Sequence, residues 1–261
     1  MPNLLDAHMN RDYAALILYD EHTNGCDIDA QFDAIRGLLA SLEQAEKLAN
    51  EELIVQERRT SELTGPARDH ANNCLNDSYY NSVYEDAARS MAAISMLAPF
   101  IEMLFTRLFS CVDRQTKYHK VSNKNHARWK LNSKYQWDCS YFVETNGNKK
   151  RGTAKGIMQI CDAIGLIQHL PKDIRILLDV IFEYRNKMFH NGFEWPKAER
   201  SEFLQNIQKS NCPSTWYNNA TWGNDPWVCY LSQDFINRCI NAIEETLDGI
   251  GAYDRWADAQ K

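Results

Sequence analysis

The feature that most constrains this chain is the scarcity of residues that interrupt helices. Only 11 glycines and 7 prolines occur in 261 residues. Between them, apolar side chains recur at spacings of three and four over long stretches, which is the period of a helix that buries one face. The sequence therefore predicts an all-α protein whose core is a bundle of four main helices.

Two stretches predict the longest helices. Residues 27–59 form one stretch, which Gly65 and Pro66 end. The second covers residues 81–112, where Pro99 is expected to kink the helix. Its apolar face comprises Ala87, Met91, Ile94, Ala98, Ile101, Phe105 and Leu108. We expect residues 1–65 to be a helical N-terminal extension and residues 66–261 to be the bundle domain.

Three further helices are predicted, over residues 153–168, 172–190 and 231–250. Pro171 marks the start of the middle one, and Asn191-Gly192 marks its end. The stretches between them, 114–155 and 193–227, are predicted to be long inserted loops. Within the first, residues 139–151 carry the pattern of a small β-hairpin around Asn146-Gly147.

The insertion at 114–155 is strongly basic. It holds eleven Lys and Arg residues against two acids, a net charge of about +9 in a chain whose formal charge is −6. Aromatic residues are interleaved with these cations, which suits single-stranded RNA because cations contact phosphates and rings stack on bases. The candidate RNA-binding residues are Lys117, Lys120, Lys124, Lys130, Lys149, Lys150 and Arg151. The alternative is a solvated loop whose aromatic rings pack on the bundle.

Several classes of chemistry find no support in the sequence. The eight cysteines form no C-x-x-C pair, and a chain of this size does not need disulfides, so reduced thiols in the cytoplasm are expected. Asp6 and Arg11 interrupt any signal peptide, and Glu102 interrupts the longest apolar stretch, so no membrane span is expected. No Gly-rich phosphate loop occurs, and no acid or Cys cluster flanks His119 or His126. We therefore expect neither a cofactor nor a metal site.

Arg185 is out of place on the helix predicted over 172–190. An ideal helix gathers its apolar side chains on one face and puts Arg185 near the middle of that face. A guanidinium there needs an acid, a phosphate or a cleft. A structural interpretation is an ion pair with Glu102, or a stem lying across the face with its head in water. The residues of the face are Ile174, Leu177, Leu178, Ile181, Phe182 and Met188.

The segment Glu183-Tyr-Arg185-Asn186-Lys-Met-Phe-His190-Asn-Gly192 resembles the R-N-x-x-x-H signature of HEPN domains. The resemblance covers this helix closely, the helical pattern of 80–250 loosely and residues 1–65 not at all. It implies a metal-independent endoribonuclease of prokaryotic toxin or antiviral defence systems. Such an enzyme acts as a homodimer on cellular RNA such as tRNA, beside an antitoxin or another defence partner. The alternative is a non-catalytic HEPN module that binds RNA or a partner protein.

The resemblance assigns catalysis to Arg185, Asn186 and His190. RNA supplies the 2′-hydroxyl nucleophile, His190 moves protons, and Arg185 holds the phosphate. Asn186 orients His190 or contacts the phosphate. Five residues separate Arg185 from His190, so they project ~140° apart on a straight helix. Either the helix unwinds at Asn191-Gly192, or two protomers share a composite site across a two-fold interface. Toxin relatives carry a regulatory tyrosine where this chain has Gly192, so that regulation is not expected.

Overall fold

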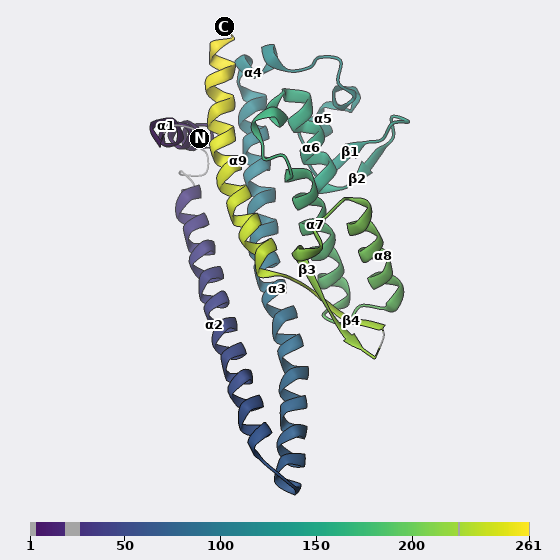
Figure 1. Cartoon of the computed structure of the whole chain (residues 1–261). Coiled ribbons are helices and arrows are strands. Elements are labelled where there is room, and N and C mark those ends of the chain that lie inside the picture. The colour runs from purple at the N-terminus through teal and green to yellow at the C-terminus, as the bar shows by residue number, and fades with distance from the viewer. Residues whose placement is uncertain (1–3, 19–26, 224, 261) are drawn as a thin grey trace. The chain divides into compact units, whose positions relative to one another are not determined.

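The computed structural model describes residues 4–18, 27–223 and 225–260, and it confirms the all-α prediction. Helices form 76% of the chain, with nine α-helices and two small antiparallel sheets in the described part (Figure 1). The helices are α1 (Leu4–Leu18), α2 (Ile28–Glu62), α3 (Pro66–Arg114), α4 (Thr116–Val121), α5 (Ser133–Gln136), α6 (Thr153–Ile164), α7 (Ile174–Asn191), α8 (Lys197–Lys209) and α9 (Gln233–Ala259). The strands are β1 (Tyr141–Val143), β2 (Lys149–Arg151), β3 (Tyr217–Trp222) and β4 (Asp225–Leu231).

The chain forms two compact units. Unit 1 comprises 1–32, 97–183 and 238–261, and unit 2 comprises 33–96 and 184–237. Four helices, α2, α3, α7 and α9, contribute residues to both units. The turn at Gly65 (φ +59°) separates α2 from α3, as expected. The boundaries of the two units do not coincide with the predicted division between residues 65 and 66. That division, into an N-terminal extension and a bundle domain, stays a prediction.

The predicted long helices are confirmed, with shifted ends. Residues 27–59 form α2, and 81–112 lie inside α3, which begins at Pro66 and runs without a break through Pro99. The apolar face of α3 is buried, apart from a half-buried Met91. By length and composition alone, α3 is apolar enough to cross a bilayer, but 56% of its apolar window is buried inside the protein. That burial is also what a core helix of a soluble protein shows.

In unit 1, the predicted insertion 114–155 is not a long loop. It folds into α4, a 3-10 turn at Ala127–Lys130, α5 and the hairpin β1–β2, in which Tyr141 pairs with Arg151. The hairpin was predicted, whereas the helical turns were not. Short polar elements of this kind are stabilised by contacts that residues distant in the sequence supply.

One such contact is made by Arg128, whose side chain is completely buried. Its guanidinium donates to backbone carbonyls of Tyr135 (2.9 Å) and Gln136 (2.8 Å), and also to those of Asp138 and Tyr141. Burial lowers the pKa of Arg128 to about 10. A buried cation needs partners for its donors. Arg128 finds them in the backbone of residues 135–141, and these hydrogen bonds connect the 3-10 turn with α5 and β1.

The hairpin is fixed against α6 at close range. A Cβ atom on Gly156 would lie 2.0 Å from the carbonyl oxygen of Cys139, so only glycine allows this approach. The amide of Gln159 then pairs with the backbone of Val143, accepting from its N–H (2.8 Å) and donating to its carbonyl (2.6 Å). The first turns of α6 therefore hold β1 in place.

In unit 2, the prediction of irregular structure over 193–227 was wrong. This stretch forms α8 and most of the antiparallel pair β3–β4. Trp195 and Trp216 are buried, and the Trp195 ring meets Phe203 edge-on at 5.1 Å between centroids. Asn218 and Asn219 disfavour a strand locally, and the pairing of β3 with β4 overrides that preference.

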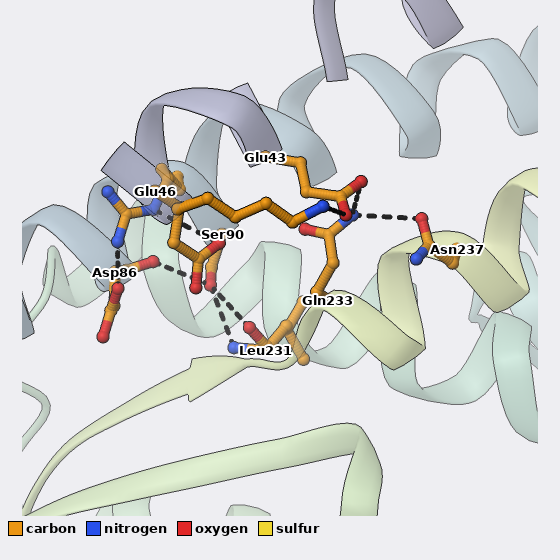
Figure 2. A network of polar contacts seen from close by, with 9 residues as sticks. Glu43, Glu46, Asp86, Ser90, Leu231, Gln233 and Asn237 are labelled. Carbon is orange, nitrogen blue, oxygen red and sulfur yellow. Dashed lines mark hydrogen bonds and ion pairs between the residues drawn. The ribbon is translucent and has the colours of Figure 1, made fainter. Parts of the chain in front are cut away.

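A polar network connects four elements of unit 2 (Figure 2). The buried Ser90 hydroxyl accepts from the backbone N–H of Leu231 at 2.9 Å, which fixes β4 on α3. Gln233 donates to Glu43 (3.3 Å) and to Asn237 (3.0 Å), which connects α2 with the first turn of α9. Arg89 pairs with Asp86 and Glu46, and burial raises the pKa of both carboxyls.

Candidate functional site

The residues of the R-N-x-x-x-H motif belong to unit 2 and lie on the last two turns of α7. The helix runs without a break to Asn191, and the N–H of Gly192 still donates to the carbonyl of Met188 at 2.9 Å. Gly192 then leaves the helix with φ +68°. The helix thus ends at Asn191-Gly192, directly after His190, where one of the two alternatives places the unwinding, and both alternatives stay predictions. Arg185 and His190 project ~140° apart and ~7.5 Å apart along the axis.

Burial divides this part of α7 into two sides. Tyr184 and Met188 are buried, and the Tyr184 hydroxyl donates to the carbonyl of Cys229 in β4 at 3.2 Å. Arg185 is half-buried, while Asn186 and His190 are exposed. Asn186 and His190 are four residues apart and so lie on adjacent turns of one face.

Phe189 occupies the same exposed surface. Its side chain is 56% exposed, and its helical angle falls between those of Arg185 and His190. Any ligand that touched both Arg185 and His190 of one chain would have to cross this ring.

Three polar contacts hold the end of α7 in place. The Lys187 ammonium pairs with Glu199 and Glu202 of α8, the latter at 2.6 Å. The Trp195 indole donates to the carbonyl of Gly192 at 2.9 Å. These contacts connect the end of α7 and the turn after the motif with α8 and Trp195.

The predicted RNA-binding residues belong to unit 1, and several of their charges are already engaged. Lys117 pairs with the buried Asp254 and, at 3.4 Å, with Asp258. Lys150 pairs with Glu144 at 2.7 Å. Lys149 lies over the rings of Tyr135 and Tyr141, at 3.4 Å and 4.3 Å from their centroids. Arg151 is exposed, 5.9 Å from the Tyr141 centroid.

The remaining cations of the segment differ from these. Lys120, Lys124 and Lys130 are exposed, and none of the ion pairs among the described residues uses them. The rings of Trp129 and Trp137 lie 5.1 Å apart and are half-buried. The two rings therefore pack on one another while these three lysines reach solvent, and both interpretations of the segment stay predictions.

The histidines of the segment have local partners. His126 lies 3.3 Å from a carboxylate oxygen of Asp162, and its Nδ1 accepts from the backbone of Arg128. His119 contacts the carbonyl of Asp113 at 2.8 Å. Within the described ranges, no three His, Cys, Asp or Glu side chains are grouped as metal ligands would be.

Comparisons of the chain with protein-family models, with curated proteins and with solved structures found no match.

Proposed function

We propose that the protein is a metal-independent endoribonuclease with a HEPN-like core, and that Arg185, Asn186 and His190 form its site. The observation that carries the proposal is the placement of this triplet on the end of α7. Asn186 and His190 are exposed on adjacent turns, and the half-buried Arg185 lies beside them.

The chemistry needs only these side chains and the RNA. His190 takes the proton of the 2′-hydroxyl as this oxygen attacks the adjacent phosphate, and a protonated histidine returns a proton to the leaving 5′-oxygen. The Arg185 guanidinium contacts two phosphate oxygens and stabilises the charge that develops on them. The products are a 2′,3′-cyclic phosphate and a 5′-hydroxyl.

The continuous helix favours a site shared by two copies. Arg185 and His190 point ~140° apart on one helix, so an Arg from one protomer and a His from the other complete each site. The exposed Phe189, between them, supplies apolar area for this contact. Cellular RNA, with tRNA among the candidates, is the proposed substrate, and an antitoxin or defence partner is the proposed regulator.

The purified full chain, incubated with mixed RNA in EDTA, tests the proposal. Cleavage should persist and leave cyclic phosphate ends, because no step uses a metal. His190→Ala and Arg185→Ala should each lower the rate by ~10²–10⁴-fold, since each removes a group from the transition state.

His70→Ala and Arg59→Ala are the matched controls, because both residues are exposed on helices of unit 2 outside the motif. These two variants should cleave like the parent. Restoration of activity only by a divalent ion, or products with 3′-hydroxyl ends, would contradict the mechanism. RNA binding without any cleavage would favour the non-catalytic HEPN module.

A further inference from the structure

Unit 1 contains a half-open groove that the proposed ribonuclease chemistry does not use. Its volume is about 500 Å³, within the range of small-ligand sites. The first strand and turn of the β1–β2 hairpin, one face of α6 and the first turns of α7 line it. Phe142, Val143 and Met158 give it apolar walls, and Lys155, Arg175 and Asp179 bring charge.

Most other polar groups of the groove are already paired. Glu144 pairs with Lys150 at 2.7 Å, Asp162 lies 3.3 Å from His126, and the amide of Gln159 is bound to the backbone of Val143. Glu144 and Asp162 each already face a basic side chain, and the Gln159 amide is bound to the backbone.

Asp179 is different. Its carboxylate is half-buried, and among the described residues it makes no hydrogen bond and no ion pair. Burial raises its pKa, and the charges of Lys155 and Arg175 act in the opposite direction. Its oxygens are open to the groove, so they are available to accept from a ligand that brings donors.

We propose that this groove binds a guanine nucleotide, with Asp179 accepting from the base and Lys155 and Arg175 contacting the phosphate. A carboxylate offers two acceptors side by side, and guanine presents two neighbouring donors, N1–H and the 2-amino group. Adenine has an acceptor at N1 beside its amino group, so the same carboxylate repels it. The Phe142 ring and Met158 give the base an apolar wall.

The size and charge of the groove agree with this ligand. A volume of about 500 Å³ accommodates a mononucleotide. The two cations outnumber the one unpaired acid, so an anionic phosphate balances the site. The groove belongs to unit 1 and the R-N-x-x-x-H residues to unit 2, so this proposal does not depend on ribonuclease activity.

Isothermal titration of the full chain with GMP, AMP and guanosine tests the proposal. GMP should bind saturably, and AMP should bind at least ~10-fold more weakly because one donor is lost and an acceptor faces Asp179. Guanosine should also bind ~10-fold more weakly, since it has no phosphate. Titration with an RNA tetramer that contains one internal guanosine then shows whether the groove binds a guanosine within an RNA strand or a free guanine nucleotide. Tighter binding than GMP assigns the groove to an RNA strand, and weaker binding assigns it to the free nucleotide.

Variants of the groove give the second test. Asp179→Asn should remove the preference for GMP over AMP and leave the fold intact, because it replaces an unpaired carboxylate with a neutral group of the same shape. Arg175→Ala should weaken GMP and leave guanosine unchanged. Asp113→Asn and Lys172→Ala, exposed and outside the groove, are matched controls that should bind like the parent.

Circular dichroism confirms that each variant is folded. His190→Ala should retain GMP binding, so a failed ribonuclease assay leaves this inference intact. No saturable GMP binding, equal affinity for AMP, or unchanged selectivity in Asp179→Asn would each overturn it.

Discussion

At the scale of single residues, two arginines of unit 1 each donate several hydrogen bonds and so connect separate segments of the chain. Arg128 satisfies carbonyls of the 114–155 segment, as described above. Arg238 of α9 contacts Asp173 through Nε (2.7 Å) and Nη2 (2.5 Å), and it also contacts Glu245 through Nη1 (2.7 Å). The planar guanidinium matches carboxylate geometry, so a lysine would not replace either residue. Asp173 precedes α7, so this ion pair connects the start of α7 with α9.

Stability should therefore depend on Asp173 in a pH-dependent way. Hydrogen bonding from Arg238 holds the pKa of Asp173 below its ordinary value. The stability that a depressed pKa contributes is present above the unfolded-state pKa of about 4, and it is lost as the pH falls below that value. Asp173→Asn should cost about 1 kcal/mol in urea unfolding at pH 7, and the difference from the parent should shrink near pH 3.

The matched control is Asp33→Asn, which removes an exposed pair with Arg36 within α2. That variant should change the free energy of unfolding by less than about 0.5 kcal/mol. An equal loss for Asp173→Asn at both pH values would show that packing, and not the ion pair, holds this end of α7.

At the scale of elements, the basic segment 114–155 divides into structural and solvent-facing cations. Arg128 is buried and bound to backbone carbonyls, and Lys117 pairs with the buried Asp254, whereas Lys120, Lys124 and Lys130 are exposed. The net charge of the segment therefore overstates the number of cations that can contact RNA. In the described part of the segment, Lys120, Lys124, Lys130 and Arg151 present their charges to solvent, and none of them takes part in the ion pairs of their neighbours.

Replacing Lys120, Lys124 and Lys130 by Gln should weaken RNA binding and flatten its dependence on salt. Three fewer phosphate contacts on a single strand should reduce the slope of log K against log salt by ~2. Cleavage of a short substrate at saturation should change little, because these lysines take no part in the chemical step. Fluorescence anisotropy over a range of salt concentrations measures both effects.

Lys117→Gln is the contrasting variant. It leaves the buried Asp254 without its cation, so it should lower the melting temperature and leave the salt slope unchanged. An unchanged slope in the triple variant would remove the RNA-binding role from this segment.

At the scale of the whole molecule, the proposed site requires two chains. Arg185 and His190 lie on one unbroken stretch of α7, so we propose that two chains bring them together in a composite site. Mixing Arg185→Ala protein with His190→Ala protein tests this directly. Each mixed dimer has one site with both groups intact, so activity should return to about a quarter of the parent value.

A protein carrying both substitutions is the control. Mixed with either single variant, it completes no site, and activity should stay absent. If the two single variants remain inactive after subunit exchange, which size-exclusion chromatography with light scattering can verify, then Arg185 and His190 act within one chain.

The sequence by itself determined the helical class and the main helices. The apolar faces of α3, α7 and α9, the turn at Gly65-Pro66 and the β1–β2 hairpin follow from local period and turn chemistry, which are properties of neighbouring residues. The R-N-x-x-x-H segment was visible for the same reason, because its residues lie within two turns of one helix.

Only the tertiary structure decided which polar and charged side chains are paired and which distant segments pack together. Lys117 appeared as a free cation because its partner Asp254 lies 137 residues away in the chain. The carbonyls that bury Arg128, the pairing of β3 with β4, and the groove around Asp179 likewise depend on residues that local patterns do not connect. Periodicity reports which face of an element is apolar, whereas the partner of a polar side chain is set by the packing of distant segments. That difference explains why the helices were predicted and the roles of individual charges were not.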